Sequence, residues 1–221
     1  MATFPENALA ADRARALALT PVSRETVARL DRFVALLLKW QQTTHLIAPS
    51  TVPTLWTRHI ADSLQLIDLA PEARVWADMG SGAGFPGLVI ACAVCEQPGR
   101  RVHLIESNTR KAAFLRAAVA ATESPAIVHA IRMDKFVESV DGEIDVVTAR
   151  AVSPLELLLR ECAPLLRSGS LGLFPKGQDV VVELTEASKS WKIVAELVPS
   201  RTDTRGRIVV VRGLERAEQV P

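Results

Sequence analysis

Four glycines follow a short apolar run and an acidic residue, a combination that can hold a ligand against the main chain. The run at residues 75–77 predicts a buried strand that Asp78 closes. Glycine is needed where φ is positive or where a ligand approaches the backbone more closely than a Cβ permits. Residues 88–94 predict a helix whose free N–H groups and positive dipole end face the same turn. We therefore expect a ligand on this turn. The glycines are Gly80, Gly82, Gly84 and Gly87.

Two spacings within this stretch point to two different cofactors. Residues 82–87 match G-x-G-x-x-G, the dinucleotide fingerprint, and Glu106 follows at the distance expected for a residue that holds a ribose. The other spacing, Asp78-x-Gly80-x-Gly82-x-Gly84, resembles the first motif of S-adenosylmethionine-dependent methyltransferases. The first spacing favours a nicotinamide-dependent oxidoreductase, and the second favours a methyltransferase.

The elements that position this turn alternate in the βα rhythm of a parallel sheet. Residues 191–198 and 207–211 are separated by too few residues for a crossover helix, so we expect them to pair antiparallel. Methyltransferases are similar to this α/β plan, a Rossmann-like class I sheet that is parallel except for an antiparallel C-terminal hairpin. The chain has no tyrosine, on which short-chain dehydrogenases depend. The other strands are expected at 75–78, 101–106, 126–130, 144–149 and 170–174.

The first seventy residues show no strand pattern and predict a helical unit. Residues 7–19 predict one helix, Thr20-Pro21 predicts the start of a second that extends to Trp40, and residues 54–69 predict a third. We expect this unit, residues 1–70, to pack on a second unit, residues 71–221, that carries the glycine-rich turn.

Composition indicates a globular protein of 221 residues with a net charge of +1. No apolar stretch is long enough to span a membrane and the first residues are too polar for a signal peptide, so we expect no membrane partner and a cytoplasmic location. Arginines gather near both ends of the chain, which suits either solvated faces or an RNA partner. A non-catalytic RNA-binding module is therefore a further alternative.

Cysteine usage indicates neither a disulfide framework nor a metal centre. The count is three, and the C-x-x-C pair lies inside a predicted helix with no second pair to complete a zinc site. We expect no metal ligands and interpret these side chains as small buried hydrophobes. The cysteines are Cys92, Cys95 and Cys162.

Several segments together resemble one family, the bacterial RNA methyltransferases called RsmG or GidB, over about residues 40–211. They are residues 78–87 (DMGSGAGFPG), 58–59 (RH), 62–64 (DSL), 104–107 (LIES), Lys111, 114–115 (FL), 148–151 (TARA) and 175–177 (PKG). The resemblance implies a Rossmann-like methyltransferase that uses S-adenosylmethionine to methylate N7 of one guanine in small-subunit (16S) ribosomal RNA. Its partner is then this RNA or the small ribosomal subunit, and we expect a monomer. The chain departs from the family at Gln41 and His45, so the loop between them receives no role.

The resemblance also implies roles for individual residues. Glu106 accepts hydrogen bonds from the ribose hydroxyls, a task suited to a carboxylate. Guanine N7 carries a lone pair and no proton, so we expect no catalytic side chain, no dyad of His59 and Asp62, and catalysis by positioning. The expected cofactor-binding residues are Asp78, Gly80, Gly82, Gly84, Phe85, Glu106, Met133, Asp134 and Arg150.

Overall fold

A seven-stranded sheet forms the centre of the computed structural model, which describes residues 6–217. The strands are β1 (Val75–Met79), β2 (Arg101–Ile105), β3 (Ala126–His129), β4 (Val146–Thr148), β5 (Leu171–Lys176), β6 (Trp191–Pro199) and β7 (Arg207–Arg216). Their order across the sheet is β3-β2-β1-β4-β5-β7-β6. The first five strands pair in parallel, whereas β7 is antiparallel to both β5 and β6. The expected α/β class and the antiparallel hairpin are therefore confirmed.

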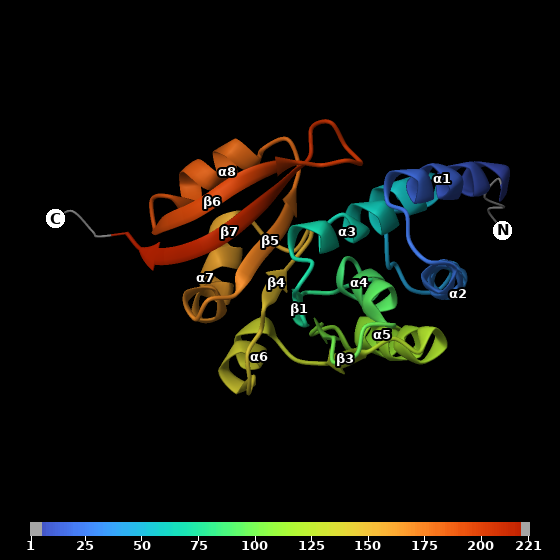
Figure 1. Cartoon of the computed structure of the whole chain (residues 1–221), viewed down its shortest axis with the longest axis horizontal. Coiled ribbons are helices and arrows are strands. Elements are labelled where there is room, and N and C mark those ends of the chain that lie inside the picture. Colours follow the sequence, from blue (N-terminus) through green and yellow to red (C-terminus); the bar gives the residue numbers. More distant parts are fainter. Residues whose placement is uncertain (1–5, 218–221) are drawn as a thin grey trace.

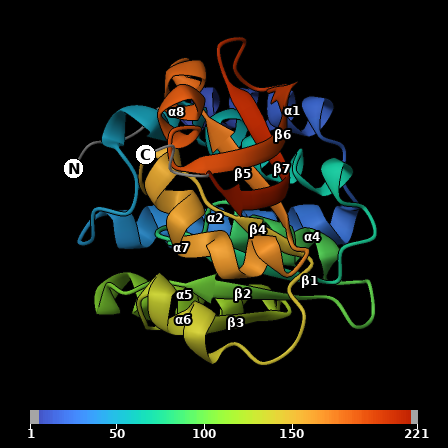
Figure 2. The same cartoon turned by 90° about the vertical axis from the view of Figure 1, so that its left-hand side faces the viewer.

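Helices cover both faces of this sheet (Figures 1 and 2). They are α1 (Glu6–Leu19), α2 (Arg24–Gln41), α3 (Asp62–Leu64), α4 (Gly87–Val94), α5 (Thr109–Thr122), α6 (Met133–Ser139), α7 (Leu155–Arg167) and α8 (Val180–Ala187). The 3₁₀-helices η1 (Pro49–Thr54) and η3 (Ile67–Leu69) and the π-helix η2 (Trp56–Ala61) complete the N-terminal segment. No helix within residues 6–217 is long and apolar enough to cross a membrane.

Two apolar cores lie between the sheet and its helices, one on each face of the sheet. One core joins the N-terminal helices, α4 and α5 to the sheet, and it runs from Ala16 through Phe33 to Val210 without interruption. The other packs α6, α7 and α8 against the opposite face. The central strands are buried on both faces, as the near-continuous apolar runs of a parallel sheet require. The N-terminal helices therefore share a core with the sheet that carries the turn.

The second helix begins later than the sequence predicted. Thr20 donates its hydroxyl to the carbonyl of Ala16 and so closes α1, while the hydroxyl of Ser23 accepts the N–H of Thr26 and caps α2. The prediction of a start at Thr20-Pro21 was wrong. Thr20 and Ser23 are both residue types that cap helix starts, and only their hydrogen bonds show which of the two does so.

The expected helix at 54–69 is a succession of short helical pieces rather than one α-helix. The π-helix η2 begins beside Thr57, whose N–H and hydroxyl both donate to the buried carboxylate of Asp12 on α1, at 3.0 and 2.5 Å. A π-helix widens the turn and is often found at functional sites. Helix α6 was not predicted at all, because its seven residues offer too little periodicity.

Candidate active site

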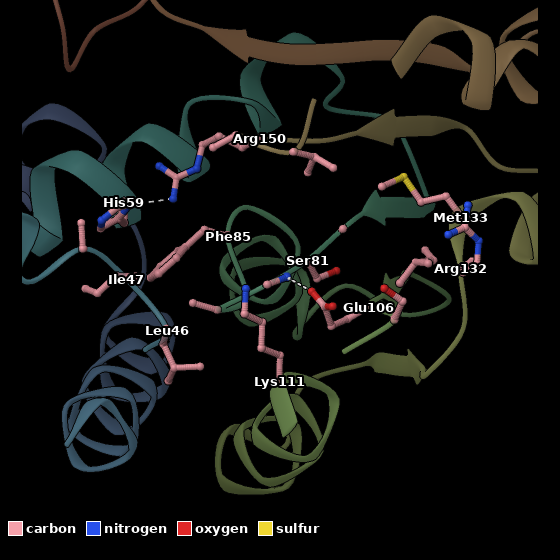
Figure 3. Close-up of a pocket in the computed structure, with 18 of the residues that line it drawn as sticks. Leu46, Ile47, His59, Ser81, Phe85, Glu106, Lys111, Arg132, Met133 and Arg150 are labelled. Carbon is pink, nitrogen blue, oxygen red and sulfur yellow. Dashed lines mark hydrogen bonds between the residues drawn. The ribbon is translucent and has the colours of Figure 1, made fainter. Parts of the chain in front are cut away.

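A cavity of about 560 Å³ opens where the parallel strands end. The glycine-rich turn follows β1, Glu106 follows β2, and Arg150 follows β4, so all three lie at the carboxyl edge of the sheet. Open α/β sheets bind ligands at this edge. Figure 3 shows His59 and Arg150 on one side of the cavity, Met133 on the other, and Phe85 and Glu106 between them. The cavity thus brings together residues from both halves of the chain.

Gly80 brings bare main chain to the cavity wall. Its φ is +78°, and a Cβ built there would lie 2.8 Å from Val152 and 3.3 Å from the methyl group of Met133. A side chain at this position would therefore be strained and would fill the space between two lining residues. Its N–H and that of Ser81 both donate to the carbonyl of Ile105, which fixes the turn to β2.

Asp78 lies behind the turn and does not line the cavity. Its Oδ2 accepts the N–H of Gly87 at 2.9 Å, and burial raises the pKa of this carboxyl to about 7. We expected the first N–H groups of α4 to be free and to face the glycine-rich turn. That expectation was wrong, because the N–H groups of Gly87 and Leu88 are taken by Asp78 and by the carbonyl of Gly84. Asp78 thus ties the helix start to the strand that precedes the turn.

Glu106 joins the turn to the next βα connection. Oε2 accepts the N–H of Gly82 at 2.9 Å and Oε1 accepts the N–H of Asn108 at 2.7 Å, and the residue is only 8% exposed. A carboxylate offers about four lone-pair directions, so one on each oxygen remains for a ligand. The carboxylate is held rigidly at the cavity wall and keeps capacity for two further donors.

The other predicted site residues divide between the cavity wall and its surroundings. Phe85 and Met133 line the cavity together with Gly80, Gly82, Glu106 and Arg150. Gly84 instead packs between α4 and α2, where a Cβ would lie 3.2 Å from the ring of Phe33. Asp134 is half-buried and pairs with Arg132, which itself lines the cavity. Lysine and arginine side chains at the rim, which carried no role in the sequence prediction, are Arg58, Lys111 and Arg132.

Arg150 connects the sheet to the N-terminal segment. Its Nη1 donates to the carbonyl of Arg58 at 2.9 Å and to Oδ2 of Asp62 at 3.3 Å, and its Nη2 contacts Nδ1 of His59 at 2.6 Å. The guanidinium also lies 5.2 Å from the ring centre of Phe85, at cation–π distance. Only 15% of the side chain is exposed. Burial lowers the pKa of Arg150, and Asp62 opposes this shift.

His59 is a neutral part of the same wall. Because a guanidinium has no acceptor, Nδ1 of His59 accepts from Arg150, and the ring proton lies on Nε2, 3.0 Å from the hydroxyl of Thr51. Burial, together with the charges of Arg150 and Arg58, lowers the pKa of His59 to about 3. Its ring stacks on Phe85 with 4.8 Å between centroids. Both nitrogens are engaged, so this imidazole has no free position for proton transfer.

Gln41 holds a part of the wall that sequence reasoning missed. Its Oε1 accepts the N–H groups of Leu46 and Ile47 at 2.9 and 3.1 Å, and its Nε2 donates to the carbonyl of Ile47 at 2.7 Å. Leu46 and Ile47 line the cavity. The side chain thus fixes the loop to which we assigned no role from the sequence, and neither periodicity nor a motif indicates this contact, although it spans only five to six residues.

Comparison with known proteins places the chain in a family. A family model described as rRNA small subunit methyltransferase G matches residues 26–213. The chain belongs to this family. It is 56% identical over 215 residues to the ribosomal RNA small subunit methyltransferase G of Bradyrhizobium sp. (strain BTAi1 / ATCC BAA-1182), covering 97% of both chains. It is 52% identical over 204 residues to the protein of the same name from Methylobacterium sp. (strain 4-46), covering 92% of this chain and 96% of the relative.

Solved structures show the same fold at low sequence identity. The O-methyltransferase from Bacillus cereus, solved in complex with SAH, superposes with a TM-score of 0.59 at 13% identity and covers 94% of this chain and 99% of its own. The rRNA small subunit methyltransferase G family member described here is thus an S-adenosylmethionine-dependent methyltransferase of the Rossmann-like class. This membership selects the methyltransferase over the nicotinamide-dependent and non-catalytic alternatives.

The lining of the first cavity fits S-adenosylmethionine. Gly80 presents bare main chain at the cavity wall, and Glu106 retains lone pairs for hydroxyl donors. The volume of about 560 Å³ lies within the range of roughly 300–1,000 Å³ for small-molecule sites. The size of the cavity and the acceptor oxygens of Glu106 therefore both suit a nucleoside-containing cofactor in this member of the rRNA small subunit methyltransferase G family.

A second cavity of about 660 Å³ adjoins the first in this methyltransferase. The two share the wall formed by Arg58, His59 and residues 150–152. Asp62 braces that wall, because its carboxylate accepts from Arg150 and from the hydroxyl of Thr202 in the β6–β7 connection, at 3.3 and 2.8 Å. The residues that line only the second cavity are mostly polar and include Lys176, Glu183, Asp203 and Arg207.

Proposed function

We propose that the protein transfers a methyl group from S-adenosylmethionine to N7 of one guanine in the 16S RNA of the small ribosomal subunit. The observation that carries this proposal is the shared wall of the two cavities. A base held in the second cavity lies next to the cofactor cavity, with Arg150 between them. Relatives named ribosomal RNA small subunit methyltransferase G support the ribosomal RNA of the small subunit as the substrate.

The chemistry asks the protein for orientation rather than for proton transfer. When bound, the cofactor supplies an electrophilic methyl group on a sulfonium. Guanine N7 carries an accessible lone pair, so no general base has to create the nucleophile. His59 is neutral and has both nitrogens engaged, in keeping with this scheme. Arg150 and Phe85 hold the wall at which base and cofactor meet, and orientation of this kind contributes several kcal/mol.

We further propose a division of labour along the chain. Residues 1–70 act as a helical unit that supplies the wall at Leu46, Ile47 and His59, and residues 71–221 act as the cofactor-binding domain with Asp78, Gly84 and Asp134 in supporting positions. Basic side chains at the rim, including Arg58 and Lys111, provide the electrostatic attraction that RNA phosphates require. The enzyme acts as a monomer in the cytoplasm.

Transfer of labelled methyl groups to small ribosomal subunits that lack the modification tests the proposal. Label recovered as 7-methylguanosine after nucleoside analysis is the expected result. Label absent from both subunits and free ribosomal RNA, with binding of S-adenosylmethionine intact by calorimetry, would leave the methyltransferase assignment standing and overturn the substrate.

A further inference from the structure

The part of the second cavity beside the shared wall carries a cation and a carboxylate that contact each other. Lys176 lies at the end of β5 and Glu183 on α8, with Nζ and Oε2 2.7 Å apart. The lysine also donates to the carbonyl of Ser153 at 2.9 Å, and Oε2 accepts the N–H of Leu155 at 2.7 Å. Their side chains are 10% and 27% exposed. The pair is thus fixed in place at the start of α7.

Both partners keep hydrogen-bonding capacity on the cavity side. An ammonium has three N–H donors, and two of those on Lys176 are used by Glu183 and Ser153. Among the residues that the structure describes, Oε1 of Glu183 accepts no hydrogen bond, since both of its contacts go to Oε2. A donor and an acceptor therefore remain side by side on a wall that a ligand can reach.

The orientation of the base decides which of its edges meets this pair. If N7 faces the wall shared with the cofactor cavity, as the proposed function requires, N1 and the exocyclic N2 point away from that wall. Lys176 and Glu183 line the second cavity and not the first, and their contacts to Ser153 and Leu155 put them directly beside the shared wall, where they can meet the edge of the base that adjoins N7, beginning with O6. Guanine presents the O6 acceptor next to the N1–H and N2–H donors on this edge, the reverse of the adenine pattern.

We propose that Lys176 and Glu183 read the Watson–Crick edge of the target guanine, a role that rests on the proposed function. Lys176 donates to O6, and Oε1 of Glu183 accepts from the N1–H and N2–H groups. With adenine, the amino group would face the ammonium, and the N1 lone pair would face the carboxylate. A site built to pair with one pattern rejects the other strongly, because its own polar groups are then left unpaired.

The test compares methylation of guanine and adenine at the target position. Small subunits are prepared from unmodified ribosomal RNA with either guanine or adenine there, and kcat/KM is measured for each with the wild type and with Glu183→Gln. The wild type should prefer guanine by at least about 100-fold. In Glu183→Gln the amide can donate to adenine N1, so the preference should fall by at least about tenfold. Glu186→Gln, on the exposed face of the same helix, is the matched control and should keep the full preference.

A purely structural role gives a different result. If Glu183 only holds Lys176 and the start of α7, the variant loses rate on both bases alike and the guanine preference stays unchanged, which overturns the proposal. Binding of S-adenosylhomocysteine reports whether Glu183→Gln is folded. If this variant does not fold, the guanine preference is measured instead with Lys176→Met, which removes the donor to O6. A wild type that binds the cofactor but methylates neither base in subunits refutes the proposed function, and the role of this pair with it.

Discussion

Replacement of Glu106 by alanine removes the carboxylate that we expect to hold the cofactor ribose. Each oxygen of Glu106 already accepts one backbone N–H, so one lone pair on each remains for a hydroxyl. Loss of charged hydrogen bonds of this kind should weaken cofactor binding by about 1.5–3 kcal/mol. This corresponds to a rise in Kd of roughly 10- to 150-fold.

Calorimetric titration with S-adenosylhomocysteine measures this change without turnover. A second titration uses the analogue of S-adenosylhomocysteine that lacks the ribose 2′-hydroxyl and tests whether Glu106 contacts this hydroxyl. The wild type should bind the analogue more weakly than S-adenosylhomocysteine, whereas Glu106→Ala should bind both ligands with the same affinity. Thermal unfolding without ligand reports how much the turn depends on the same carboxylate through Gly82 and Asn108. Glu138→Ala, at an exposed position on α6, is the control.

The ribose assignment fails under either of two outcomes. One is an unchanged Kd for Glu106→Ala. The other is a variant that remains as sensitive to removal of the 2′-hydroxyl as the wild type, which would mean that Glu106 acts only by shaping the turn through Gly82.

Four further changes test other parts of the site. Gly80→Ala should lower cofactor affinity in calorimetry by about 1–3 kcal/mol, because it places a Cβ at positive φ, 2.8 Å from Val152. Asp78→Asn should remove a pH dependence of the unfolding free energy. In the wild type the carboxyl has a pKa of about 7 when folded and stays protonated there after the unfolded chain has lost the proton, so the unfolding free energy should fall by up to about 4 kcal/mol as the pH rises from about 4 to 8. Because His59 is no general base in our scheme, His59→Gln should lower the rate of single-turnover methyl transfer by less than about tenfold. The wild type should lose about 2 kcal/mol of unfolding free energy between pH 7 and 5, because the imidazole is protonated in the unfolded state and stays neutral in the folded state. His59→Gln should not show this loss. Arg150→Lys should reduce kcat/KM at least about tenfold, because an ammonium cannot reproduce the planar, forked contacts of the guanidinium; a variant with wild-type kinetics would contradict this.

The sequence was sufficient for those features that depend on local pattern. The alternation of short apolar runs with helical periodicity predicted the parallel sheet. The short connection between the last two strand-like runs predicted the antiparallel hairpin. The glycine-rich turn and Glu106 were found because both lie directly after strands, where residue type and position have a fixed meaning in α/β folds.

Features that depend on contacts between distant residues could not be predicted in the same way. Arg150 meets Arg58, and Asp62 meets Thr202, across 92 and 140 positions of the chain. The role of Asp78 in tying the helix start was missed, because an acid at a strand end looks the same whether it faces a ligand or a backbone N–H. The second cavity was not predicted, because its lining comes from segments far apart in the sequence whose meeting in space no local pattern indicates.

The place of β7 in the sheet sets an order for the assembly of the enzyme during its synthesis. This strand lies between β5 and β6, and its residues 207–216 follow nearly all of the chain that builds the two cavities. Until it has left the ribosome, β6 has no partner in the sheet and the connection that carries Thr202 has no anchor on one side. A chain that stops just before residue 207 would keep the glycine-rich turn, Glu106 and Arg150, and would still lack the strand that joins the last part of the second cavity to the sheet. We therefore expect activity to be gained only when the final strand is made, and a product truncated before residue 207 to be inactive although its cofactor motif is complete.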